Sequence, residues 1–132
     1  MSVPIICVAL LGLLSIVLGM VVTVGRGKFN TLFGSSNDPE DKLFHFVRAH
    51  SNNAEYAPII ALMIYILSLS AYPAWVLWFM VLATVSRFLI ALGLVFPATL
   101  AKPNPLRFVG AAGTYVFGLG LGVALLVQGL GI

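Results

Sequence analysis

Long runs of mostly apolar residues alternate with short polar segments along this chain. Three such runs lie at 3–24, 74–96 and 105–130, and at 1.5 Å per residue each is long enough to cross a bilayer as a helix. A fourth stretch, 38–71, opens on Asp-Pro-Glu, which is typical of a helix start, and carries polar residues near its middle. We therefore predict four membrane-spanning helices in a single domain that covers residues 1–132.

The composition points to lipid as the surrounding medium. Of the 132 residues, 61% are hydrophobic and only 8% are charged, whereas about a quarter of a soluble domain is charged. Because the apolar runs are long and do not alternate in ten-residue segments, the expected class is an all-α membrane protein and not a β-barrel. A single cysteine, Cys7, excludes an internal disulfide, and no Cys/His cluster indicates a metal site.

The first apolar run, 3–24, has one rival interpretation, a cleaved signal peptide. It lacks a basic segment at its start, and its apolar stretch is too long for a signal peptide. We expect it to be the first membrane-spanning helix.

Basic residues gather in and beside the first and third connecting segments. They are Arg26, Lys28, Lys42, Lys102 and Arg107. The second connection and both termini carry no lysine or arginine, so the positive-inside rule predicts cytoplasmic first and third loops and both termini on the opposite side. The net charge of +3 is thus interpreted as membrane topology and not as a nucleic-acid-binding surface.

Three polar residues interrupt the second apolar stretch at helical spacing. Arg48, Asn52 and Glu55 share one helix face, with the first and last roughly 10 Å apart along the axis. Ionisable groups at this depth are costly unless they face a bundle interior or a wet cavity and find partners. The stripe is therefore a candidate binding site for a molecule that is charged at both ends.

A further arginine, Arg87, lies inside the third run. Arg87 and Glu55 should lie at one level, roughly 15 Å and 16 Å from the same ends of neighbouring helices. They are expected to form a buried pair, which is either purely structural, with Arg48 extending to the surface, or part of a ligand site. Because cations outnumber the one carboxylate at depth, the site favours a net-anionic, zwitterionic peptide of modest size whose ammonium group Glu55 would hold.

Other features carry weaker predictions. Gly118 and Gly122 have the spacing of a helix–helix contact motif, which predicts an oligomer contact or arises by chance. His45 and His50 flank the polar stripe, and each is interpreted as a solvated or hydrogen-bonded side chain and not as a proton shuttle. The sequence contains no Ser/His/Asp set, phosphate loop or paired carboxylates, so hydrolase and nucleotide chemistry are not supported.

The segment from Arg48 to Pro58, R-A-H-S-N-N-A-E-Y-A-P, resembles the signature of the MAPEG family, the membrane-associated proteins in eicosanoid and glutathione metabolism. The family pattern is Arg-x-x-x-Asn-x-x-Glu-Tyr-x-Pro on the second helix, and every fixed position is present. Arg87 on the third helix and the four-span layout match as well, so the resemblance covers essentially the whole chain. Because the chain lacks a longer eicosanoid-type pattern, it resembles a bacterial member of the family.

The resemblance implies a homotrimer in the bacterial inner membrane, with glutathione as co-substrate bound between adjacent subunits near the cytoplasmic face. The residues to which it assigns glutathione binding are Arg26, Arg48, Asn52, Glu55, Tyr56 and Arg87. It assigns stabilisation of the glutathione thiolate, the actual nucleophile, to Arg107.

The function expected from this resemblance is a glutathione-dependent transferase or peroxidase that acts on hydrophobic electrophiles or lipid hydroperoxides. Catalytic relatives carry tyrosine after the third-helix arginine, where this chain has Ile90, Ala91 and Leu94. A non-catalytic glutathione- or lipid-binding protein of the same fold is therefore the alternative. A small multidrug transporter is less well supported, because such proteins carry their glutamate in the first helix and an arginine-rich site would repel cationic drugs.

Overall fold

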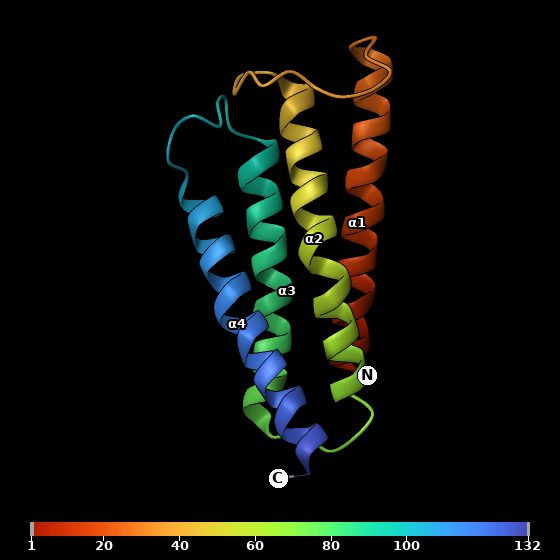
Figure 1. Ribbon diagram of the computed structural model, residues 1–132, viewed down its shortest axis with the longest axis vertical. Helices are drawn as coiled ribbons and strands as arrows, with labels where there is room; N and C mark the ends of the chain where they lie inside the picture. The colour runs from red at the N-terminus through yellow and green to blue at the C-terminus, as the bar shows by residue number, and fades with distance from the viewer. Residues whose placement is uncertain (1, 132) are drawn as a thin grey trace.

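The computed structural model of the protein describes residues 2–131, and within that range it contains four helices and no strands. The helices are α1 (Val3–Lys28), α2 (Lys42–Leu67), α3 (Ala74–Val95) and α4 (Pro105–Leu130). The α1–α2 and α3–α4 loops lie at one end of the bundle and both chain ends lie at the other (Figure 1). The predicted all-α fold is confirmed, while the trimer stays a prediction.

Three helices, α1, α3 and α4, are long and apolar enough to cross a membrane. Helix α2 is as long as α1, at 26 residues, but its mean hydropathy is lowered by the polar residues of its first half. It lies between α1 and α3 along the bundle (Figure 1). Side chains that face away from the bundle are largely apolar, as on α1, where Leu13, Ile16, Met20 and Val24 are exposed. This surface is that of an integral membrane protein.

Three helix ends differ from the sequence-based expectation. Helix α1 continues through Gly25 to Lys28, because Gly25 is buried against Phe46 and because Arg26 and Lys28 complement the negative helix end. The expected start of α2 at Asp38 is wrong. The Asp38 side chain instead closes a turn by accepting from the Glu40 amide, and α2 begins at Lys42. Its far end comes at Leu67, before the expected end at 71.

The cap of α2 is Asp41. Its Oδ1 accepts a hydrogen bond of 2.9 Å from the Leu43 amide, which satisfies one of the free N–H groups of the first turn. A second hydrogen bond, 2.5 Å from the Ser36 hydroxyl to Asp41 Oδ2, is the main cause that lowers the pKa of this carboxyl below its ordinary value. The start of α2 is thus set by a loop contact that the helix-start pattern at 38–40 does not reveal.

Helices α3 and α4 approach very closely because α4 presents glycine to α3. A Cβ atom added to Gly110 would lie 2.5 Å from the backbone nitrogen and 2.9 Å from the Cα of Ile90. Added to Gly113 or Gly120, it would collide with the side chains of Ser86 or Phe79. The other two glycines of α4 noted in the sequence, Gly118 and Gly122, meet open space or an ordinary contact instead. Close packing of α3 and α4 therefore depends on Gly110, Gly113 and Gly120.

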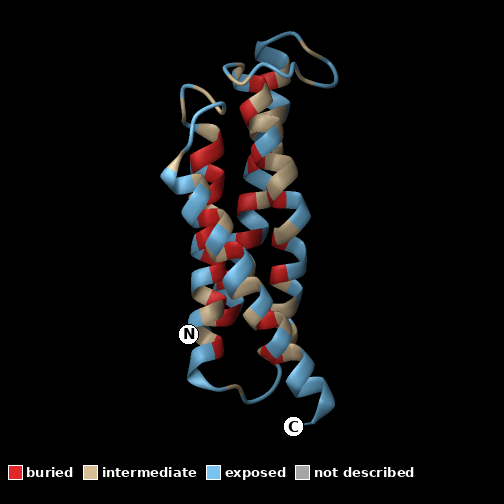
Figure 2. Ribbon diagram, turned by 60° about the vertical axis from the view of Figure 1, so that its left-hand side comes forward, coloured by how far each residue is buried: buried red, intermediate tan, exposed pale blue. Residues whose placement is uncertain are grey.

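The buried residues are distributed along the length of the bundle (Figure 2). They form two apolar clusters with a polar layer between them. The cluster nearer the chain termini includes Leu11, Ile64 and Met80, and the cluster nearer the two loops includes Leu18 and Ala49. The polar layer takes residues from all four helices: Ser15, Asn52, Asn53, Arg87 and Thr114. This layer places hydrogen-bonding groups in the middle of an otherwise apolar bundle.

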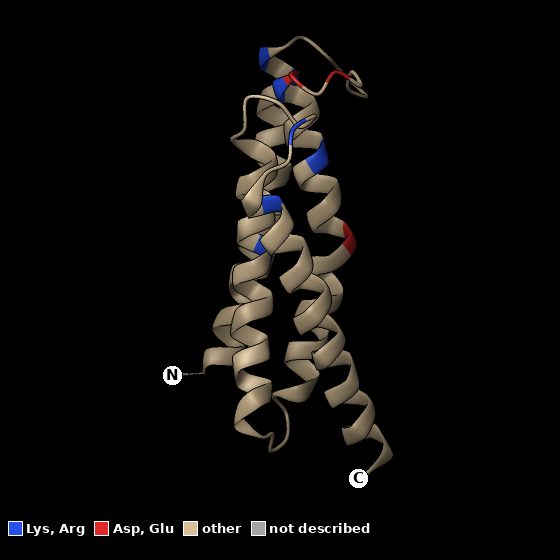
Figure 3. Ribbon diagram, turned by 90° about the vertical axis from the view of Figure 1, so that its left-hand side faces the viewer, with Lys and Arg blue, Asp and Glu red and all other residues tan. Residues whose placement is uncertain are grey.

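The lysine and arginine residues lie in the half of the bundle that carries the α1–α2 and α3–α4 loops (Figure 3). That placement is the charge asymmetry on which the predicted topology rests. Which side of the membrane this end faces stays a prediction.

Candidate functional site

Arg87 is the centre of the polar layer. The side chain is only 1% exposed, and its Nη2 donates to both the backbone oxygen and the Oδ1 of Asn52, at 2.9 Å and 2.8 Å. Its Nη1 lies 3.5 Å from Thr114 Oγ1 on α4, and the guanidinium carbon lies 5.3 Å from the centre of the Tyr56 ring. Arg87 thus joins α2, α3 and α4 and fixes the orientation of the Asn52 amide.

The expected pair between Glu55 and Arg87 does not form within the chain, and that prediction is wrong. Arg87 directs its donors to Asn52 and Thr114, while Glu55 is exposed. Glu55 lies three residues after Asn52, which turns it by about 60° around the helix, away from the α3-facing side. The buried guanidinium is therefore surrounded by neutral oxygens and an aromatic ring and not by a carboxylate.

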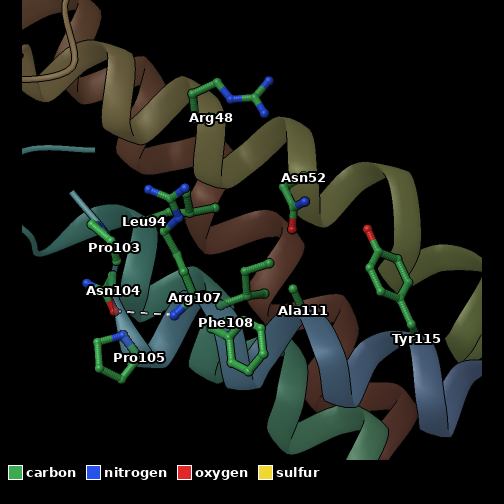
Figure 4. Close-up of a pocket in the computed structure, with 11 residues that line it drawn as sticks. Arg48, Asn52, Leu94, Pro103, Asn104, Pro105, Arg107, Phe108, Ala111 and Tyr115 are labelled. Atoms are coloured by element: carbon green, nitrogen blue, oxygen red, sulfur yellow. Dashed lines mark hydrogen bonds between the residues drawn. The ribbon is translucent and has the colours of Figure 1, made fainter. Parts of the chain in front are cut away.

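A cavity of about 770 Å³ opens beside this layer, between α2 and α4 and below the loop that precedes α4 (Figure 4). Its lining residues are Arg48, Asn52, Ile90, Leu94, Pro103, Asn104, Pro105, Arg107, Phe108, Ala111 and Tyr115. Three residues expected from the sequence, Arg48, Asn52 and Arg107, are brought together there. The volume falls in the range of small-molecule sites, roughly 300–1,000 Å³.

The polar groups of the cavity are arranged by depth. Arg48 from α2 and Arg107 from α4 lie toward the loop end, and Asn52 and Tyr115 lie further into the bundle (Figure 4). None of the lining residues is acidic, so the two guanidinium groups give the cavity a net positive charge. Such a cavity suits a ligand with carboxylate groups, which arginine binds through two parallel hydrogen bonds.

Arg107 is held in place at both its backbone and its side chain. Asn104 caps α4 by accepting from the amides of Leu106 and Arg107, at 2.9 Å and 3.3 Å, and Pro105 follows in the first turn. The guanidinium Nη1 donates to the backbone oxygen of Leu100 at 2.9 Å. One bond of this kind leaves most of the five donors of an arginine for a ligand.

Tyr115 is a cavity residue that sequence reasoning missed. It points from α4 toward α2, and its hydroxyl lies 3.4 Å from that of Tyr56 (Figure 4). Tyr56 itself lies outside the cavity and lines an apolar groove of about 430 Å³ between α2 and α4, in which Tyr115 also takes part. The feature of the sequence that could have pointed to it is an isolated tyrosine two helical turns after Arg107 in a glycine-rich span.

Arg26 and Glu55 are not brought into the cavity. Arg26 lies in the last turn of α1, and its Nη1 donates to the backbone oxygen of Gly34 in the following loop at 2.8 Å. Glu55 faces outward from α2. Any contact of these two side chains with a ligand in this site therefore requires a second copy of the chain or a rearrangement.

Among residues 2–131, no group of three or more histidine, cysteine, aspartate or glutamate side chains is arranged to hold a metal ion. The free cysteine, Cys7, is buried in the apolar cluster near the chain termini.

The fold and the site define an integral membrane helical bundle with a positively charged cavity at one end, beside a buried arginine. Comparison with known families places the chain within this class: residues 4–127 match the MAPEG family, and the chain belongs to that family. No curated protein and no solved structure matches it significantly. Membership makes it a membrane protein related to glutathione and eicosanoid metabolism.

Proposed function

We propose that the cavity binds glutathione and that the protein uses it against hydrophobic electrophiles or lipid hydroperoxides in the membrane. The observation that carries the proposal is the cavity of about 770 Å³ that Arg48 and Arg107 line and whose lining includes no carboxylate. Glutathione has two carboxylates, one ammonium group and a thiol, so its net charge complements two arginines.

The chemistry that this site would support begins with the thiol. A nearby guanidinium favours the thiolate over the thiol, and Arg107 is one of the two cations at the loop end of the cavity. The thiolate then forms a C–S bond with an electrophilic carbon, and the leaving group departs with the displaced electron pair. With a hydroperoxide, it instead attacks the distal oxygen, releasing an alcohol and a sulfenic acid that a second glutathione converts to the disulfide and water.

The co-substrate would reach the thiolate from lipid. The apolar groove of about 430 Å³ between α2 and α4 shares Tyr115 with the cavity, so an apolar molecule in the groove would lie next to the polar site. This continuity favours a co-substrate that is dissolved in the bilayer over one that arrives from water.

The ammonium group of glutathione requires a carboxylate that this cavity lacks. Glu55 is the one carboxylate within the membrane-spanning part of α2, and it is exposed. In a homotrimer, Glu55 and Arg26 of one copy would complete the site of another. We propose that the functional form is this trimer in a bacterial inner membrane, with the loop end of the bundle on the cytoplasmic side.

The test is glutathione affinity and conjugation of a generic electrophile on detergent-purified protein. Arg48→Ala is expected to weaken glutathione binding roughly tenfold to a hundredfold, the value of a charge-assisted hydrogen bond. Lys28→Ala is the control, because it removes one exposed cation from the same end without touching the cavity. Equal affinity of both variants, each correctly folded, would refute the site.

Glu55→Gln tests the shared site separately. It leaves the shape of the side chain and removes its charge, so it should weaken glutathione binding in the oligomer only. Unchanged affinity in a stable oligomer would exclude Glu55 from the site while leaving the cavity in place.

A second candidate function is binding without turnover. It is favoured by Ile90 and Leu94, apolar side chains that line the cavity and offer no hydroxyl to the sulfur. Retention of glutathione without conjugation or peroxide reduction would establish it.

A further inference from the structure

His45 is a fully buried histidine on the first turn of α2 and is not part of the cavity. Its Nε2 lies 2.7 Å from the backbone oxygen of Pro39. A carbonyl oxygen only accepts hydrogen bonds, so Nε2 must carry the proton. The other ring nitrogen, Nδ1, is buried and has no partner among the residues that the structure describes. The imidazole therefore makes its one hydrogen bond, among the described residues, to the Pro39 carbonyl.

The Pro39 carbonyl joins the two loops at this end of the bundle. Besides the His45 ring, it accepts a hydrogen bond of 2.8 Å from the backbone amide of Leu100, in the α3–α4 loop. Lys42 adds a second connection, from its Nζ to the backbone oxygen of Pro97 at 2.8 Å. A carbonyl oxygen with two donors is held in both direction and distance, so His45 fixes the position at which the α3–α4 loop attaches.

The same loop residue then contacts the site. The backbone oxygen of Leu100 accepts the 2.9 Å bond from the Arg107 guanidinium. Three successive hydrogen bonds thus run from the His45 imidazole through Pro39 and Leu100 to the Arg107 side chain. Since Arg107 lines the cavity, the direction of its remaining donors depends on where Leu100 lies.

We propose that His45 is a positioning residue for Arg107 and acts on the cavity through this loop clamp, defined as the hydrogen-bonded chain His45–Pro39–Leu100–Arg107. The consequence for function rests on the proposed role of Arg107 in holding the glutathione thiolate. The clamp itself is independent of that role, because every bond in it lies within the protein.

The variants follow from the chemistry of the imidazole. His45→Leu keeps a buried side chain of similar size and removes the donor, whereas His45→Gln places an amide N–H close to the position of Nε2. The control is His50→Gln, since His50 lies on the same helix and borders a different groove, against α1.

The first measurement is hydrogen exchange of the Leu100 amide in detergent-solubilised wild-type protein and the three variants, with no glutathione present. His45→Leu should exchange about fivefold faster, because the lost hydrogen bond that protects the loop is worth about 1 kcal/mol, which is a factor of about five in the opening equilibrium. His45→Gln and His50→Gln should retain wild-type protection. Equal protection in wild type and His45→Leu would refute the clamp, whatever the protein binds.

The second measurement separates positioning from folding. His45→Leu should lower kcat roughly tenfold to a hundredfold and raise the pH at which turnover begins, with KM for glutathione changed by less than about threefold. In an Arg107→Ala background, His45→Leu should cause no further loss, because its effect passes through that guanidinium. Additive losses, or no rescue by His45→Gln, would overturn the proposal.

The two measurements distinguish failure of the clamp from failure of the proposed function. If wild-type protein binds no glutathione, the proposed function is wrong, and the exchange of Leu100 still decides the clamp. If glutathione binds without turnover, the pH dependence of glutathione affinity replaces that of kcat and must shift in His45→Leu. If binding and turnover are normal while the variants show no change in exchange or pH profile, the clamp alone is wrong.

Discussion

The substitution Gly110→Ala tests whether the close approach of α3 and α4 is a packing requirement. The added methyl group would lie 2.5 Å from the backbone nitrogen and 2.8 Å from the Cβ of Ile90, and these backbone-bound atoms have no rotamer through which to withdraw. To restore ordinary van der Waals contact, the two helices must separate by about 1 Å at this level.

The expected magnitude combines two opposing effects. Overpacking of this kind costs about 1–3 kcal/mol, while replacing a mid-helix glycine by alanine contributes up to about 1 kcal/mol in helix propensity. The net result should be a loss of about 1–2 kcal/mol in the free energy of unfolding. Gly129→Ala is the matched control on the same helix, because a Cβ there meets nothing within 4 Å and only the propensity gain remains.

The assay is thermal unfolding of the purified protein in one detergent, followed by circular dichroism. Gly110→Ala should melt several degrees below wild type and Gly129→Ala at or slightly above it. Because Ile90 lines the cavity and Arg107 lies one turn before Gly110, glutathione retention should fall only in the first variant. A melting temperature that rises equally in both variants would refute the packing argument.

Two further predictions concern charged groups. Asp41→Ala should destabilise the fold by about 1 kcal/mol near neutral pH through loss of the α2 cap. The Ser36 hydroxyl lowers the pKa of Asp41 in the folded protein, so the carboxylate stabilises the fold fully at pH values above its ordinary pKa of 3.8. This contribution is lost as the pH falls through the lowered pKa. Melting temperatures of wild type and variant should therefore converge in acid, and a constant difference would contradict the assignment. Arg87→Met should melt at or above the wild-type temperature, because a buried guanidinium with neutral partners carries a large desolvation cost. The variant should nevertheless bind glutathione more weakly, because the Asn52 amide loses the hydrogen bond that orients it. Lost stability with unchanged affinity would reverse that interpretation.

The all-α class followed from the sequence because lipid leaves few options. Backbone groups in hydrocarbon must be satisfied within each segment, so an apolar run of more than twenty residues has to be a helix whatever its neighbours do. The spacing of Arg48 and Asn52 likewise placed both on one side of α2, since helical periodicity is a local property. The basic residues near the ends of the runs could be assigned to one end of the bundle for the same reason.

What only the tertiary structure decided is which partners those residues have. Asn52, and not Glu55, contacts Arg87, because the rotation of α2 about its own axis is set by packing against α1 and α3 and not by residue spacing. Tyr115 enters the cavity only because glycines on α4 allow that helix to lie close to α3. The orientation of Arg107 depends on Leu100, whose amide donates to the Pro39 carbonyl in a loop more than fifty residues away, and no local pattern records such a contact.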